Sequence, residues 1–151
     1  VECYQNPVSM GTRCHQLACY VVHDSPFTMF CDAPTNYEKE QPCVDIITRI
    51  PDTFDETKII LGELGNFVVT ARRNGSDWYV GGQTNWDGRE VRLPLDFLSP
   101  GSYQATIVTD GINANHNAED YRIEHKTLTA SDRIGIKMAS GGGFVIKLIK
   151  E

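Results

Sequence analysis

All five cysteines of this chain lie within its first 43 residues: Cys3, Cys14, Cys19, Cys31 and Cys43. Thiolates bind zinc or act as nucleophiles, but zinc sites use close pairs such as C-x-x-C, and the chain has none. His15 adjoins Cys14, yet neighbouring residues of a helix point about 100° apart, which is a poor geometry for a nucleophile and its base. The odd number argues against a complete set of disulfides. The pattern favours cysteines as small buried side chains.

Asp55 and Glu56 form an adjacent pair of carboxylates. Hydrolysis of a glycosidic bond requires two carboxyl groups held about 5–9 Å apart. The pair follows Pro51, where the spacing of apolar residues changes, and no other candidate catalytic residue accompanies it in the sequence. We therefore favour a structural role, in which Asp55 fastens a turn at a domain junction.

Residues 110–120 are rich in oxygen ligands, with asparagine at alternate positions: Asn113, Asn115 and Asn117. Calcium prefers such ligands, but the order differs from that of an EF-hand loop, which needs glycine at its sixth position and glutamate at its twelfth. A calcium-stabilised loop and a loop held by side-chain-to-backbone turns both stay open, and the second is favoured.

Trp78, Tyr79 and Trp86 are close enough in the sequence to suggest a stacking surface for sugars. Aromatic residues of strands more often fill a core, and Trp78 is in phase with Val80. The glycine run 141–143 lacks a following lysine and serine or threonine, so it predicts a turn and not a phosphate-binding loop.

The first third of the chain has the periodicity of helices. Apolar residues recur every three or four positions in residues 7–22, namely at Met10, Cys14, Leu17 and Val21. This spacing predicts an amphipathic helix. The short apolar run 27–31 predicts a strand buried on both faces, as in a parallel sheet, and a second helix is expected from Pro42 to about Ile50. Asp32 directly follows the expected strand, at the position where (β/α)₈ barrels build their active sites.

After Pro51 the apolar residues alternate with polar ones, which is typical of strands with one buried face. Seven segments show this period: 67–71, 78–82, 91–95, 103–107, 123–127, 134–138 and 144–148. Turn-forming pairs such as Asn74-Gly75 and Asp110-Gly111 separate them. The pattern predicts a mostly β chain that ends in an antiparallel β-sandwich of about eight strands.

The chain has 151 residues and a formal net charge of −6, which suits one ordinary domain or a small domain with an attachment. It has no cluster of Lys and Arg and no apolar run of about 20 residues, so neither nucleic-acid binding nor a membrane span is expected. The chain begins with Val1 and shows no leader, so we expect a piece of a longer protein.

Several segments, taken in order, resemble the C-terminal part of glycoside hydrolase family 97, a family of α-glucosidases and α-galactosidases. They are GTRCHQLA at 11–18, SPFTM at 25–29, DAPTNY at 32–37, IPDTFDET at 50–57, WYVGG at 78–82 and GGGF at 141–144. The resemblance implies that residues 1–52 are the incomplete end of a catalytic (β/α)₈ barrel, as a helix-strand-helix remnant, and that residues 53–151 are the C-terminal β-sandwich. Asp32 would then lie at the rim of the sugar-binding site.

The resemblance also implies which groups belong upstream of this chain. The family's catalytic carboxylates and the ligands of its calcium ion have no counterpart among these residues, so neither a catalytic nor a metal-binding residue is expected here. The whole enzyme is expected to be periplasmic. Nothing in these residues separates an α-glucosidase from an α-galactosidase, or retention from inversion.

We therefore predict the C-terminal fragment of an exo-acting α-glycoside hydrolase, inactive alone, that meets an oligosaccharide substrate only through the whole barrel. The alternative is a carbohydrate-binding β-sandwich. Because the apolar stripe of the first helix would have lost its barrel partners, we also expect self-association through an exposed barrel remnant.

Overall fold

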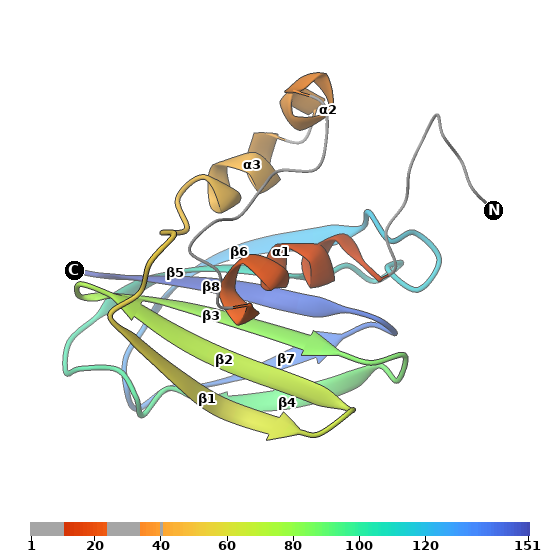
Figure 1. Cartoon of the computed structure of the whole chain (residues 1–151). Helices are drawn as coiled ribbons and strands as arrows, with labels where there is room; N and C mark the ends of the chain where they lie inside the picture. The colour runs from red at the N-terminus through yellow and green to blue at the C-terminus, as the bar shows by residue number, and fades with distance from the viewer. Residues whose placement is uncertain (1–10, 24–33, 40) are drawn as a thin grey trace.

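The computed structural model describes residues 11–23, 34–39 and 41–151. Three helices precede eight strands (Figure 1): α1 (Arg13–Val22), α2 (Pro34–Lys39), α3 (Gln41–Ile47), β1 (Glu56–Glu63), β2 (Phe67–Asn74), β3 (Asp77–Thr84), β4 (Arg89–Pro94), β5 (Tyr103–Asp110), β6 (Tyr121–Leu128), β7 (Arg133–Met138) and β8 (Gly143–Lys150). No helix in these ranges is long and apolar enough to cross a membrane.

The strands form two packed sheets, as the alternating pattern predicts. One sheet has six strands in the order β1-β2-β3-β8-β5-β6, and the other consists of β4 and β7. Every pairing is antiparallel. The main core lies between the sheets and contains the inward residues of both, for example Val80, Leu93, Ile136 and Phe144. The predicted mostly β fold with an antiparallel sandwich is therefore confirmed.

Local chemistry explains the hairpin between β2 and β3. Asn74 pairs with Asp77 across the hairpin, so only two residues form its loop. Gly75 has a φ of 62°, a left-handed conformation that glycine adopts without steric cost and that short hairpin loops require. The Asn74-Gly75 signal thus marks a turn, as expected.

Strand β1 has no counterpart among the predicted segments. Its residues Ile59, Ile60 and Leu61 are consecutive apolar residues, and the register of pairing with β2 shifts between Ile59 and Leu61. An extra residue at such a bulge breaks the alternation of buried and exposed side chains, so a search for period two passes over it. Helix α2 is likewise absent from the predicted elements.

Helix α1 has the predicted apolar stripe, but the stripe is buried and not exposed as expected. Figure 1 shows α1 lying across the outer face of the six-stranded sheet, over β3 and β8. Cys14, Leu17 and Val21 are buried there in a second apolar cluster that includes Tyr79 and Val145 of the sheet. The expectation that these three residues lack partners is therefore wrong, because the sandwich itself covers them. Met10, the predicted strand 27–31 and Asp32 lie outside the described residues.

The start of α1 is set by a capping residue. Thr12 has an extended backbone, and its hydroxyl oxygen accepts a hydrogen bond from the His15 amide at 3.2 Å. Such a cap satisfies one of the free amides of a helix N-terminus. Pro42 is the second residue of α3, within the first turn as predicted, where its missing N–H has no intrahelical role.

Candidate functional site

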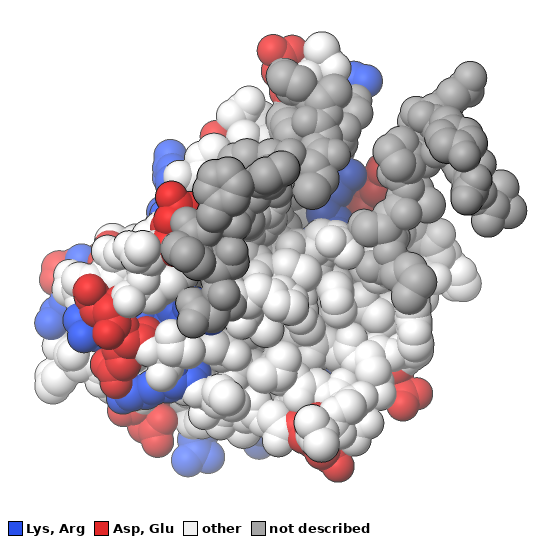
Figure 2. Space-filling model, viewed as in Figure 1, with Lys and Arg blue, Asp and Glu red and all other residues white. Residues whose placement is uncertain are grey.

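The adjacent carboxylates Asp55 and Glu56 hold the beginning of β1 in place. Asp55 accepts a hydrogen bond from the Gly75 amide at 2.7 Å, and Glu56 forms ion pairs with Lys58 and Arg73, each at 3.3 Å. Figure 2 shows acidic and basic side chains side by side over this end of the sheet. The two cations lower the pKa of Glu56, first through Lys58 and then through Arg73. Asp55 thus fastens the turn between β2 and β3 to the start of β1, which confirms its predicted role as a turn residue.

The three aromatic residues do not form a common stacking surface. Trp78 is 3% exposed and lies in the main core, edge-on to the Phe97 ring with centroids 5.0 Å apart. Tyr79 points to the opposite face, where its hydroxyl donates to the Arg49 carbonyl at 3.3 Å. Trp86 alone among the three is exposed. The hypothesis that these three rings form a stacking platform for sugars is therefore wrong.

The side-chain oxygens of the asparagine-rich loop accept hydrogen bonds from backbone amides, two of them within the loop and one in the turn after β7. Asn117 accepts from the Glu119 amide at 3.2 Å, Asp120 from the Asn113 amide at 2.8 Å, and Asn115 from the Ser140 amide at 3.1 Å. Within the described ranges, no group of three or more His, Cys, Asp or Glu side chains could hold a metal ion. The interpretation as a loop held by side-chain-to-backbone turns is confirmed.

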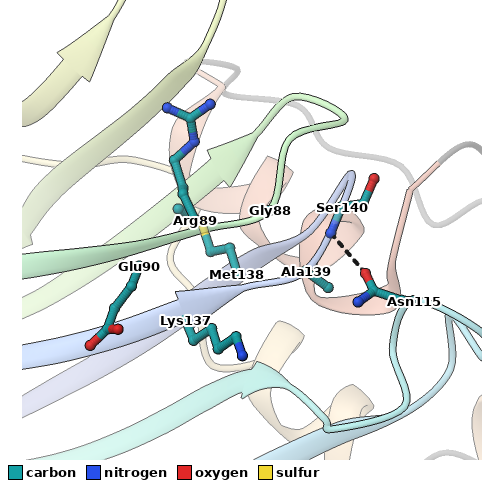
Figure 3. Close-up of a pocket in the computed structure, with 8 residues that line it drawn as sticks. All are labelled: Gly88, Arg89, Glu90, Asn115, Lys137, Met138, Ala139 and Ser140. Carbon is teal, nitrogen blue, oxygen red and sulfur yellow. Dashed lines mark hydrogen bonds between the residues drawn. The ribbon is translucent and has the colours of Figure 1, made fainter.

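A shallow pocket lies beside this loop, at the ends of β4 and β7 (Figure 3). Gly88, Arg89, Glu90, Asn115, Lys137, Met138, Ala139 and Ser140 line it. In Figure 3 the Arg89 side chain points away from those of Glu90 and Lys137. Because the lining contains no aromatic ring and only one carboxylate, it has neither the stacking surface nor the acid-base pair that a glycosidase site needs.

The seat of helix α1 is a close contact surface formed by Gly81, Gly143 and Val145 on the outer face of the sheet. A Cβ atom at Gly81 would lie 2.8 Å from Cβ of Val21, and one at Gly143 would lie 2.9 Å from Cα of His15. Both distances are too short for real carbon atoms. The helix therefore rests directly on the backbone of β3 and β8, and only glycine permits this approach.

Hydrogen bonds fasten the N-terminal end of α1 to two loops. The amide of Thr12 donates to the Gly141 carbonyl at 3.0 Å, and that of Arg13 donates to the Ala118 carbonyl at 2.8 Å. Nδ1 of His15 lies 3.1 Å from the Gly142 carbonyl, and because a carbonyl only accepts, this nitrogen carries the proton. The free amides of the helix terminus thus find partners in the sandwich.

Asp110, at the end of β5, organises the turn under this helix end. One of its carboxylate oxygens accepts from the amides of Ala139 at 3.0 Å and Gly143 at 3.1 Å. A Cβ atom at Gly142 would meet the same oxygen at 2.0 Å, so the turn closes tightly around the carboxylate. Burial, followed by the negative charge of Asp110, raises the pKa of the Cys14 thiol far above its usual value.

Cys14 should therefore report whether α1 is seated. In the native chain, alkylation of Cys14 by iodoacetamide at pH 8 is expected to be at least about 100-fold slower than in urea, because the thiol is buried and remains protonated. Peptide mass spectrometry after timed quenching measures the rate. Equal rates in buffer and in urea would show that the helix is not seated on the sheet.

Sequence reasoning missed Gly81, Gly143 and Asp110 as contact residues. Gly81 and Gly82 are adjacent inside a strand, and glycine in a strand interior is a recognised sign of close backbone approach. The role of Asp110 had no local signal, since its partners lie 29 and 33 positions further along the chain.

Comparison with known proteins places these features in a family. The model of the family described as "Glycosyl-hydrolase 97 C-terminal, oligomerisation" matches residues 53–149. A retaining alpha-galactosidase of Bacteroides thetaiotaomicron is 44% identical over 146 residues, which are 97% of this chain and 22% of the relative. A probable retaining alpha-galactosidase of Streptomyces bingchenggensis is 22% identical over 129 residues, 85% of this chain and 19% of the relative.

Solved structures agree with this assignment. A glycoside hydrolase family 97 enzyme from Pseudoalteromonas sp. strain K8, in complex with acarbose, superposes with a TM-score of 0.91 at 35% identity and covers 93% of this chain and 23% of its own. That coverage exceeds residues 53–149, so the helical segment has a counterpart too. The chain spans about a fifth of the length of the relatives it matches. It belongs to glycoside hydrolase family 97, as a C-terminal part that includes the C-terminal domain of that family.

Proposed function

We propose that this chain is the C-terminal part of a retaining, exo-acting α-galactosidase, and that it supports the catalytic barrel without chemistry of its own. The 44% identity to a retaining alpha-galactosidase over 146 residues supports the choice of substrate. Among the described residues, the acidic pair at 55–56 is an ion-paired turn, and each of the two grooves has a single carboxylate in its lining, Glu90 in one and Asp96 in the other. Catalysis therefore belongs to residues outside this chain.

The observation that carries the supporting role is the seat of α1. In our assignment α1 is a helix of the barrel, and the sandwich holds it where Gly81 and Gly143 let it approach the backbone of the strands. Barrels place catalytic groups at the ends of their strands, so a helix that is fixed in position keeps the strand before and after it in position. The sandwich thus acts as a rigid clamp on the end of the barrel.

We further propose that the domain mediates oligomerisation of the whole enzyme. The family description names this role, and the sandwich has outward faces and edges that α1 leaves uncovered. The calcium ion expected for the family would be bound upstream, since the described residues contain no suitable cluster. A periplasmic location completes the proposal.

The test compares the whole enzyme with the 151-residue chain on 4-nitrophenyl α-galactoside and α-glucoside. The whole enzyme is expected to hydrolyse the galactoside at least about tenfold faster than the glucoside, in terms of kcat/KM, since a site built to hydrogen-bond one hydroxyl rejects its epimer. The chain alone is expected to hydrolyse neither. A preference for the glucoside would contradict the assigned substrate, and turnover by the purified chain would contradict the non-catalytic role.

The alternative of a carbohydrate-binding module has less support. Trp78 is buried, and the ring pairs found among the described residues, Phe54–Tyr79 and Trp78–Phe97, do not include the exposed Trp86. Addition of galactose or maltooligosaccharides up to millimolar concentration should leave the tryptophan fluorescence of the chain unchanged.

A further inference from the structure

We propose that two copies of this chain associate through the free edge of β1, with Ile59 at the centre of the contact. The proposal rests on the oligomerising role proposed above and names the surface and the partner. The partner is a second copy of the same chain, related by a two-fold axis.

The two edges of the six-stranded sheet differ in character. Strand β6 forms one edge, and its Glu124 is ion-paired with both Arg122 and Lys126. Charged side chains of this kind protect an edge from association, but β1 also carries an ion-paired Glu56, so the two edges differ in their exposed apolar residues and not in charge. Strand β1 forms the other edge, and there Ile59 is 72% exposed. Of the two edges, only β1 carries a large exposed apolar side chain among the described residues.

A shallow groove runs beside Ile59. It lies between β1 and the segment after β4, and its lining consists of Lys58, Ile59, Ile60, Pro94, Asp96 and Phe97. The Phe97 ring stacks edge-on against Trp78, so a rigid aromatic pair supports the groove from below. The lining combines apolar side chains with the charged Lys58 and Asp96, the mixture of apolar contacts and polar rim that protein interfaces have.

The groove is suited to a copy of itself. In a two-fold contact, a residue near the axis meets its own counterpart, and every other contact occurs twice. Ile59 would meet Ile59 of the other copy, and each Lys58 would approach the Asp96 of the other copy, which pairs opposite charges at both rims. Lys58 now lies 3.3 Å from Glu56 and over the Trp78 ring, 5.7 Å from its centroid; an exposed ion pair of this kind stabilises little, so its exchange for a pair with Asp96 costs little, while the contact with Trp78 would have to be kept or replaced.

The bulge decides the kind of contact. Because the register of β1 shifts between Ile59 and Leu61, a regular ladder of hydrogen bonds to a second β1 would be interrupted at its middle. We therefore place the attraction in the side chains and not in an extended sheet. The outer face of the sheet is not available at the position of α1, since the helix already covers Gly81 and Val145.

The competing surface lies at the loop tips, where Leu64, Trp86 and Ile112 are exposed. None of the three lines either of the two grooves beside the sandwich. Trp86 is also engaged with its own chain, since its ring leaves only 2.7 Å to a Cβ atom at Gly141. These residues therefore serve as controls.

The test is the mass of the whole enzyme and of the 151-residue chain in solution, by sedimentation equilibrium across 0.1–100 µM, concentrations chosen to bracket about micromolar affinity. Both are expected to be dimers at the upper end. Ile59→Asp should weaken association by at least about 100-fold, because it buries two like charges against each other. Ile112→Asp and Leu64→Asp, which place the same charge elsewhere, should leave the mass unchanged.

A charge exchange provides a second, gentler variant on exposed residues. Lys58→Glu or Asp96→Lys alone should weaken association about tenfold, and the double variant should recover most of the loss, since the pair is restored with opposite polarity. Far-UV circular dichroism confirms that each variant is folded, and kcat/KM of the Ile59→Asp enzyme reports the proposed activity separately from the mass.

Three results would overturn the proposal: a wild-type chain and enzyme that stay monomeric at 100 µM, an Ile59→Asp variant that stays dimeric, or dissociation caused by Ile112→Asp or Leu64→Asp. None of them concerns the substrate, so failure of the interface and failure of the proposed α-galactosidase activity give different readouts.

Discussion

Gly81→Val is expected to lift helix α1 from the sheet and to lower the free energy of unfolding by about 2–3 kcal/mol. The new side chain would begin 2.8 Å from Cβ of Val21 and 3.2 Å from the Ala18 carbonyl oxygen. The carbonyl oxygen belongs to the helix backbone, so the clash cannot be relieved by a change of rotamer. Valine has a higher strand propensity than glycine, but that gain is smaller than the cost of overpacking.

Gly62→Val is the matched control, since Gly62 also lies in a strand of the same sheet and its added Cβ would have 3.6 Å to its nearest neighbour. Urea unfolding measures the stability of both variants, and alkylation of Cys14 measures whether α1 is seated. We expect rapid alkylation for Gly81→Val alone. A Gly81→Val chain with the stability and Cys14 protection of the wild type would show that the helix is not held by this contact.

Asp110→Ala is expected to lower the free energy of unfolding by about 2–4 kcal/mol, because two backbone amides would lose their acceptor inside the protein. Those amides belong to Ala139 and Gly143, which lie on either side of the turn that receives the N-terminus of α1. The loss should therefore also accelerate alkylation of Cys14 in the native chain.

Two controls distinguish the loss of the two hydrogen bonds to Asp110 from the loss of any carboxylate in a turn. Asp110→Asn keeps an acceptor oxygen and should cost about 1 kcal/mol. Asp132→Ala removes a carboxylate that accepts from the amide of Thr129 at 2.7 Å and from its hydroxyl at 3.1 Å, and it should cost about 1 kcal/mol and leave Cys14 protected. Equal losses for Asp110→Ala and Asp132→Ala would contradict the special role of the half-buried Asp110 carboxylate.

The sequence pattern predicted the sandwich well because buried and exposed side chains alternate along most of its strands. Strand β7, for example, alternates exposed and buried residues from Arg133 to Met138 without a fault. Strand β1 was missed at Ile59–Leu61, where the bulge removes the alternation on which the prediction depends. The alternation of apolar and polar residues predicts a strand only where the backbone is regular, and a bulge interrupts that alternation.

The helix α1 illustrates a second limit. Its apolar stripe correctly identified Cys14, Leu17 and Val21 as buried, but a stripe says nothing of the surface that covers it. We expected missing barrel partners, and the structure supplies Tyr79 and Val145 of the sandwich in their place. For the candidate site, local chemistry predicted only which residues have structural roles. Asp55 holds a turn, and the asparagine-rich loop is stabilised by side-chain-to-backbone hydrogen bonds, both as expected.

The glycine seat also bears on how this family could be rearranged by recombination. A gene fusion that transfers residues 53–151 to a foreign barrel would bring Gly81 and Gly143 against a helix shaped for different neighbours, and close backbone contact tolerates no such mismatch. The segment that must be transferred as one unit therefore begins before α1 and includes both the helix and the sandwich. Chimeras joined within residues 24–33, so that α1 comes from its own barrel and the sandwich from another enzyme, should fold less well than those joined ahead of Thr12.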